Sequence, residues 1–214
     1  MNFLFNITGA NTPFIKEYDI ASATAISAGE LVGIDDNLVV KANSGDYVLG
    51  VAAEDHPGVS DILNPRANGT KIRVNVTYGA VYSVPSPKYT ASASTATTIV
   101  TTSAGLSTSI SGATAVLVYK APTSTNTDKI GTKRRISACA ISGATATLTV
   151  ASGGAACAGD VYALIPDVGT EMYLDTAGTG AAFYNSASSV KLISVCSDCD
   201  AAFIGVKLKT TFAG

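Results

Sequence analysis

The stretch "KIRVNVTYGAVYSV", Lys71 to Val84, decides the fold class. Ile72, Val74 and Val76 alternate with polar residues in its first half. A period of two places one set of side chains in a core and the other in water, which is the pattern of a half-buried strand. β-branched and aromatic residues continue to the end of the stretch, as strands favour. We therefore expect strand structure here.

The rest of the chain repeats this pattern with almost no helical periodicity. Turn signals recur every 8 to 12 residues, which is typical of a sandwich or barrel. The expected fold is all-β: a small β-barrel or β-sandwich module with a second β-rich module. Strands are predicted at residues 30–34, 38–42, 47–53, 71–84, 115–121, 134–142, 146–151, 161–165, 171–175, 191–196 and 203–209.

Residues 90–114 are rich in Thr, Ser and Ala, and we expect ordered strand or extended structure there rather than disorder.

The sequence also contains two pairs of similar segments, which we call echoes. "ISGATAVLVY" (110–119) resembles "ISGATATLTV" (141–150), and "AGELVGI" (28–34) resembles "AGDVYALI" (158–164). A hairpin duplication and convergent turn chemistry both explain them.

These observations predict four parts. They are an N-terminal arm at 1–20, a β-barrel domain at 21–89, a Thr/Ser/Ala-rich β insertion or linker at 90–157, and a C-terminal β module at 158–214.

Charge is sparse: 14% of the 214 residues are charged, against about 25% in ordinary soluble domains. Interface cores are depleted in charge, so this composition favours an assembly protein that packs against copies of itself or a larger scaffold. The net charge of −2 gives no electrostatic footprint for nucleic acid. No apolar run approaches the ~20 residues of a membrane helix. "KIGTKRR" (129–135) is expected to be a solvated loop, or a contact for an acidic partner.

The N-terminal stretch "MNFLFNITGAN" has no basic segment and too short an apolar run for a secretion signal. The glycosylation sequons at Asn6, Asn68 and Asn75 therefore predict no glycans.

The four cysteines are Cys139, Cys157, Cys196 and Cys199. The last two form a C-x-x-C, but strand-like flanks surround it, whereas a redox motif normally opens a helix. A zinc site would need the other two to converge on it. We expect reduced structural thiols; a disulfide or a metal site is the alternative.

Glu54, Asp55 and His56 form the triplet most suggestive of chemistry. In a strand, the middle residue points away from its two neighbours, so the three cannot converge. We expect the solvated end of a strand. His56 is the only histidine, and no nucleophile elbow, P-loop or dinucleotide motif is present. We predict no catalytic, cofactor-binding or metal-binding residues, and no enzymatic activity.

The segment Ala25 to Pro85 resembles the head decoration (capsid cement) proteins of tailed bacteriophages. The resemblance lies in an "aGdlV" strand at Ala28–Val32, a "vlGVa" strand at Val48–Ala52 and a "G..i.V...G.vy" strand pair at Gly69–Tyr82. These motifs are strand-and-turn patterns without catalytic residues. The Thr/Ser/Ala-rich insert and the C-terminal module depart from the short form of the family.

The resemblance implies a β-barrel or β-sandwich protein, commonly a homotrimer, on the outer surface of a virion after synthesis in the host cytoplasm. Its partners would be the major capsid protein and itself, with no nucleic acid, membrane or cofactor. It also implies an N-terminal arm that adds to the sheet of the shell. Phe3, Phe5, Ile7 and Phe14 are then the expected capsid contacts. Alternatively, this segment is the first strand of the barrel.

Two other functions stay open. An adhesin on a virion or cell surface would bind host glycans through the C-terminal module, with Tyr173 and Tyr184 as candidates. A redox protein would use Cys196 and Cys199.

Overall fold

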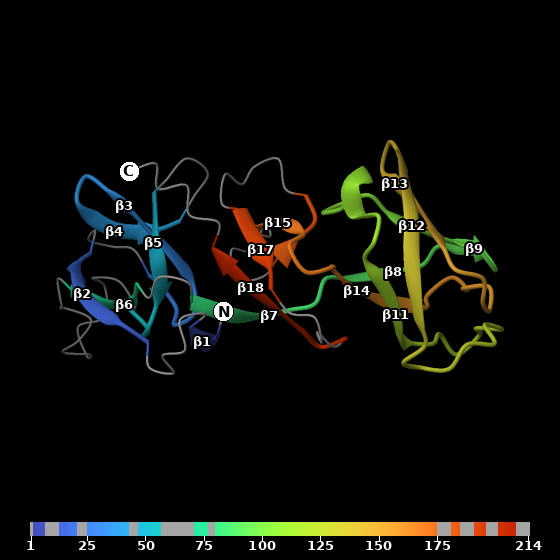
Figure 1. Ribbon diagram of the computed structural model, residues 1–214, viewed down its shortest axis with the longest axis horizontal. Helices are drawn as coiled ribbons and strands as arrows, with labels where there is room; N and C mark the ends of the chain where they lie inside the picture. Colours follow the sequence, from blue (N-terminus) through green and yellow to red (C-terminus); the bar gives the residue numbers. More distant parts are fainter. Residues whose placement is uncertain are drawn as a thin grey trace.

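A computed structural model describes residues 2–6, 13–20, 25–42, 47–56, 71–76, 80–174, 181–184, 191–195 and 201–208. The chain is all-β, as predicted, and its strands form three antiparallel sheets. The sheets follow one another along an elongated body (Figure 1). The accessible surface of 10866 Å² exceeds the roughly 9,000 Å² of a compact monomer of this mass, in keeping with that shape.

The sheet at one end has five strands. Their order is β2 (Ile15–Asp19), β6 (Lys71–Asn75), β5 (Tyr47–Ala52), β3 (Leu31–Asp35) and β4 (Leu38–Lys41). An isolated bridge between Ile20 and Val39 brings the outer strands β2 and β4 together, so the sheet curls into a half-barrel. A small core fills it: Ile20, Ile26, Val32, Val39, Ala52, Ile72 and Val74.

The alternation that predicted a half-buried strand is confirmed in β6. Ile72 and Val74 are fully buried, while Lys71 and Arg73 are exposed. Asn75 departs from the pattern because it is buried as well.

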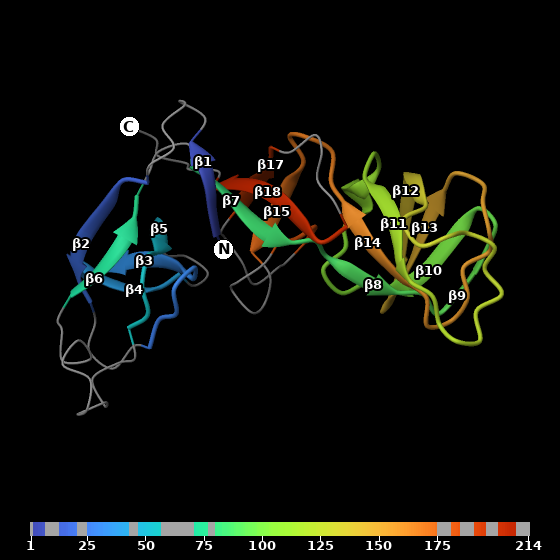
Figure 2. The ribbon, with the colours of Figure 1, turned by 90° about the horizontal axis from the view of Figure 1, so that it is seen from below.

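The middle sheet has six strands. Their order is β1 (Asn2–Asn6), β7 (Ala80–Pro85), β18 (Phe203–Leu208), β17 (Lys191–Ser194), β15 (Glu171–Leu174) and β16 (Ala181–Ala182). The first and last strands therefore lie side by side with β7, which pairs with β1 on one side and β18 on the other. Figure 2 shows the same meeting from a second side.

Two expectations change here. The stretch expected as one strand from 71 to 84 is divided, because β6 and β7 belong to different sheets. Instead of a free arm, Asn2–Asn6 forms the edge strand of the chain's own middle sheet. The alternative, a first strand of the barrel, fits Ile15–Asp19, which is β2 of the half-barrel, and not Asn2–Asn6.

The third sheet has seven strands. Their order is β8 (Lys88–Thr90), β14 (Val161–Ile165), β11 (Thr114–Tyr119), β12 (Lys133–Ser142), β13 (Thr145–Val150), β10 (Thr98–Thr102) and β9 (Ala93–Thr95). Residues 91–92 connect the two edge strands directly, and the hydroxyl of Thr101 donates a hydrogen bond of 2.8 Å to the carbonyl of Thr90. The sheet therefore curls on itself. The expected order in 90–114 is confirmed by β9, β10 and the 3-10 turn η1 (Thr108–Ile110).

Strand pairing divides the chain differently from the four expected parts. The seven-stranded sheet holds the strands of 90–157 together with β8 and β14. The described strands within 158–214 are divided between that sheet and the middle one. A continuous hydrophobic core joins the two, running from Tyr82 and Met172 to Leu117 and Leu148.

One turn recurs before five strands. In this four-residue turn, the N–H of the fourth residue donates a hydrogen bond of 3.0 or 3.1 Å to the C=O of the first. The third residue is a glycine with φ between 84° and 97°. Positive φ at this position defines a type II turn and favours glycine. The turns at residues 27–30, 110–113, 129–132, 157–160 and 167–170 lead directly into β3, β11, β12, β14 and β15. The echo between 28–34 and 158–164 is therefore structural.

The second echo lies on both sides of β12. β11 and β13 each pair with that strand, and they bury matching residues: Ala115 and Leu117 in one, Ala146 and Leu148 in the other. The turns before them differ, because Gly143 belongs to a tight hairpin.

Candidate functional site

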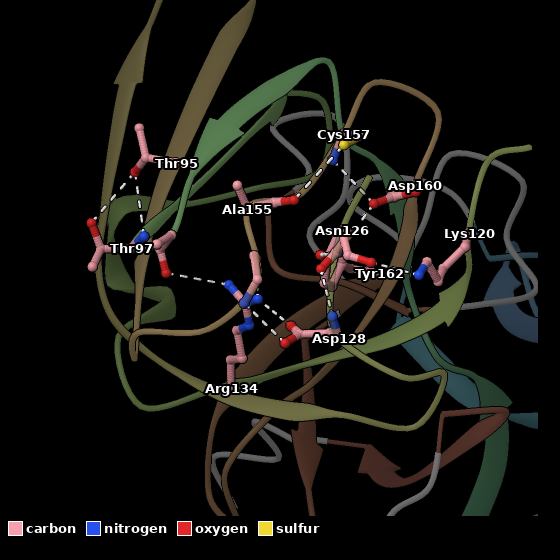
Figure 3. Close-up of polar contacts among 12 residues, drawn as sticks. Thr95, Thr97, Lys120, Asn126, Asp128, Arg134, Ala155, Cys157, Asp160 and Tyr162 are labelled. Atoms are coloured by element: carbon pink, nitrogen blue, oxygen red, sulfur yellow. Dashed lines mark hydrogen bonds and ion pairs between the residues drawn. The ribbon is translucent and has the colours of Figure 1, made fainter. Parts of the chain in front are cut away.

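Buried polar groups gather at one end of the seven-stranded sheet (Figure 3). The carboxylate of Asp160, which is fully buried, accepts hydrogen bonds from the main-chain N–H of Ala121 and Cys157, both at 3.0 Å. It also accepts from Ser124 Oγ at 2.9 Å and Asn126 Nδ2 at 3.1 Å. Burial raises the pKa of Asp160, but these hydrogen bonds outweigh it and the net pKa is lowered. The charge therefore ties residues 121–126 to the start of β14.

A second buried charge lies beside it. The Arg134 guanidinium, 2% exposed, bonds the Asp128 carboxylate and the Gly154 carbonyl, while Asp128 Oδ1 accepts from the Gly154 N–H at 2.9 Å. The expectation of a solvated loop at 129–135 is wrong for this residue, because Lys133–Arg135 begins β12 and Arg134 points inward. Most polar atoms of the cluster are occupied by protein partners, so its role is to brace the fold. The described residues contain no group of three or more metal-ligating side chains.

Two of the four cysteines lie in the described part of the chain, and both are free thiols. Cys139 is buried, and burial raises its pKa. Cys157 is partly exposed, and hydrogen bonds from Thr125 and Ser124 lower its pKa. Cys196 and Cys199 lie outside the described residues.

The triplet of Glu54, Asp55 and His56 does not form one site, because each residue has a separate structural role. Glu54 forms an ion pair of 2.7 Å with Arg73, and Asp55 accepts a hydrogen bond of 2.8 Å from the Ala28 N–H. His56 joins Ile26 through two main-chain hydrogen bonds of 2.7 Å and is 4% exposed. The expectation of a solvated strand end is therefore wrong for the imidazole.

The most open structural feature is the outer edge of β2. This strand pairs with β6 on one side, and no described strand pairs with Ile15–Asp19 on the other. All its side chains except the partly buried Tyr18 are exposed. This strand is not among those predicted from the sequence, because "IKEYD" shows little hydrophobic alternation.

Main-chain hydrogen bonds show which groups face that edge. The Arg73 N–H donates to Glu54 at 3.1 Å, and the Arg73 carbonyl accepts from the Ala53 N–H at 2.9 Å. Both groups of Arg73 therefore point away from β2. Glu17 stands opposite Arg73, so the two form the non-hydrogen-bonded type of antiparallel pair. The N–H and C=O of Glu17 must then face outward.

The pair formed by Phe14 and Val76 confirms which residues of β2 turn their main-chain groups toward β6. The Phe14 carbonyl accepts from the Val76 N–H at 2.9 Å, so the alternate residues point their main chain inward. Ile15 shares the phase of Glu17 and directs its main-chain groups outward, whereas Asp19 lies beside the bridge that joins Ile20 to Val39 of β4. The edge is thus a short row of main-chain donors and acceptors suited to an added strand.

Side chains along the edge mix apolar and charged groups. Phe14 is 56% exposed and Ile15 43%. The Lys16 ammonium lies 5.4 Å from the centre of the Phe14 ring, and Glu17 forms an ion pair of 3.3 Å with Lys71. An exposed edge with apolar side chains is a site where another chain can pair.

The three expected capsid-contact residues that the structure describes, Phe3, Phe5 and Phe14, do not gather in one place. Phe3 and Phe5 belong to β1, where their backbones stand opposite Tyr82 and Val81. Ile7 lies outside the described residues. Of the three described residues, only Phe14 lies at the open edge of β2.

The two tyrosines proposed for glycan binding do meet. The rings of Tyr173 and Tyr184 lie edge to face with centroids 5.7 Å apart, and Tyr184 is 48% exposed.

No helix in the described residues is long and apolar enough to cross a membrane. Comparisons with protein-family models, curated proteins and solved structures found no match to this chain.

Proposed function

We propose that this is a structural, non-enzymatic protein of the virion, which binds the outside of an icosahedral phage head and stabilises it by bridging major capsid protein subunits. The single observation that carries the proposal is the outer edge of β2, with its outward main-chain groups at Ile15 and Glu17. An extended segment of the shell would continue the half-barrel by one strand there. Strand addition supplies affinity through main-chain hydrogen bonds.

Two further features support the proposal. The segments that resemble decoration proteins supply β3, β5 and β6, three neighbouring strands of the sheet that carries this edge. The low charge density favours contacts that bury little unpaired charge. Each contact can be weak, because many copies on one particle act together.

The test uses heads assembled from the major capsid protein encoded in the same genome. Purified protein is added, and co-sedimentation and the temperature of DNA release are measured. We expect saturable binding and a higher release temperature. Heads that bind none of the protein, or a genome without a capsid gene, would contradict the proposal.

A second candidate function is glycan binding by a surface adhesin, favoured by the pairing of Tyr173 with the half-exposed Tyr184. Aromatic faces suit the apolar faces of sugars. A glycan array tests it: binding that is lost in Tyr184→Ala would support the adhesin, and signals at background would exclude it.

A further inference from the structure

Charge is divided unevenly along the molecule. Residues 13–76, which supply the five-stranded sheet, contain nine Asp and Glu against five Lys and Arg, a net charge of −4. Residues 88–165, which supply the seven-stranded sheet, contain two Asp and Glu against six Lys and Arg, a net charge of +4. These sheets lie at opposite ends of the body (Figures 1 and 2). The molecule is therefore a long electric dipole.

At the negative end, unpaired acids surround an exposed apolar side chain. Asp35 stands opposite Leu38 across the β3–β4 hairpin, and the Ile20–Val39 bridge places Asp19 beside the same leucine. Asp19, Asp35 and Asp36 are exposed and form no ion pair within the described residues, and Leu38 is 37% exposed. Asp19, Asp35, Asp36 and Leu38 are called the acidic corner.

At the positive end, a turn presents the complementary groups. The Gly131 N–H donates to the Leu117 carbonyl at 2.7 Å, which holds the turn at residues 129–132 against β11. Ile130 is 65% exposed and Tyr119 49%. Lys129 and Lys133 are exposed and form no ion pair in the part of the chain that the structure describes. Tyr119, Lys129, Ile130 and Lys133 are called the basic turn.

We propose that the basic turn of one copy docks on the acidic corner of another, head to tail. Each surface combines exposed apolar side chains with exposed charges of one sign, and the signs are opposite, so the two complement each other. A two-fold contact of either surface with itself would place like charges together. Each contact therefore joins the two different surfaces, and the copies form an antiparallel pair, a ring or an open row according to the rotation between them.

The contact is weak and sensitive to salt. Each surface comprises four side chains, well short of the roughly 800 Å² per partner of a stable complex. Its charges are exposed, and the screening length falls from about 30 Å at 0.01 M salt to about 3 Å at 1 M.

Sedimentation velocity of the full chain at about 10 mM and about 1 M salt tests the proposal. At low salt we expect an average mass that rises with concentration above the 21.6 kDa monomer, and at high salt the monomer alone. A protein that stays monomeric at low salt up to about 1 mM would overturn it, as would association that persists unchanged in high salt.

Two variants with altered charges test whether the basic turn and the acidic corner are the surfaces in contact. One variant carries Lys129→Glu and Lys133→Glu, and the other Asp35→Lys and Asp36→Asn. Asparagine is chosen at position 36 because φ is 45° there, a conformation that Asn tolerates. Each variant alone should be monomeric at low salt, and an equal mixture should associate again, because the intact acidic corner of the first variant then meets the intact basic turn of the second. Unchanged association of either variant, or a mixture that stays monomeric, would contradict the proposed surfaces; melting temperatures check that both variants fold.

Discussion

Gly50 in β5 lies against the carbonyl of Asn75 in β6 so closely that a Cβ on the glycine would stand 2.2 Å from that oxygen. The register of β5 against β3 shifts between Val32 and Gly33, beside this contact. The sequence motif "vlGVa" therefore has a physical reason for its glycine: only a residue without a side chain lets the two backbones approach.

Replacing Gly50 with alanine should force β5 and β6 apart. We expect a loss of about 2–4 kcal/mol in the free energy of unfolding, measured by chemical denaturation. Gly131→Ala is the control, because nothing lies within 4 Å of its Cβ position and only its φ of +91° is unfavourable. That variant should lose about 1–2 kcal/mol. Equal losses would refute the close approach.

Arg134 and Arg135 are neighbours in sequence but differ in burial. The ion pair of Arg134 with Asp128 has side chains 2% and 11% exposed, and that of Arg135 with Asp167 has side chains 67% and 47% exposed. Arg134→Met leaves the Asp128 carboxylate without its cation, and we expect a loss of about 3–5 kcal/mol. Arg135→Met should lose less than about 1 kcal/mol. Similar denaturation midpoints for the two variants would show that the buried pair does not brace the fold.

Asp160 should make stability depend on acid pH. Its pKa in the folded protein lies below the value of about 3.9 in the unfolded chain. The unfolded state therefore binds the proton more readily, and the stabilisation, complete above about pH 5, is lost as the pH falls through the folded pKa. Asp160→Asn should be less stable at pH 7, and its stability should fall less steeply between pH 5 and the acid range. If the free energies of unfolding of the unmodified protein and of Asp160→Asn fell equally with pH across that range, this role would be contradicted.

The two described thiols should differ in reactivity. Cys157 is partly exposed with a lowered pKa, and Cys139 is buried with a raised one. In a Cys196→Ser/Cys199→Ser background, a thiol reagent at pH 7 to 8 should modify one cysteine quickly, and peptide mapping should identify Cys157. Thr125→Ala removes the hydroxyl next to its sulfur and should slow the reaction. Faster modification of Cys139 would count against the described burial.

Much of the local structure could be predicted from the sequence because it depends on alternation and turn chemistry. Ile72 and Val74 are buried as their spacing indicates, and the echoed glycine turns start strands where the sequence repeats. The pairing of β7 with both β1 and β18 could not be predicted, because it joins strands that are far apart in the sequence and leaves no local pattern.

The buried polar cluster was missed although a signal for it exists. Arg134 is in phase with the buried Ile136, so the period of β12 places it inward, but a basic run is ordinarily solvated. A second signal for the buried polar cluster is that Glu30 and Asp160 occupy the same position in the echoed segments 28–34 and 158–164. Each carboxylate accepts the N–H three residues earlier, at 2.9 and 3.0 Å. The open edge of β2 has no such signal, because alternation indicates faces and not which edge lacks a partner.

The binding of heads by Glu17→Pro tests most directly whether β2 docks on the shell. Proline removes the outward N–H of Glu17 and leaves the inward hydrogen bonds to β6 in place, so the fold should survive, as it does for proline on edge strands. Glu17→Ala, which keeps the N–H, is the matched control. We predict that Glu17→Ala binds heads like the unmodified protein and that Glu17→Pro, with a similar melting temperature, does not bind. Full binding by Glu17→Pro would contradict strand addition at this edge.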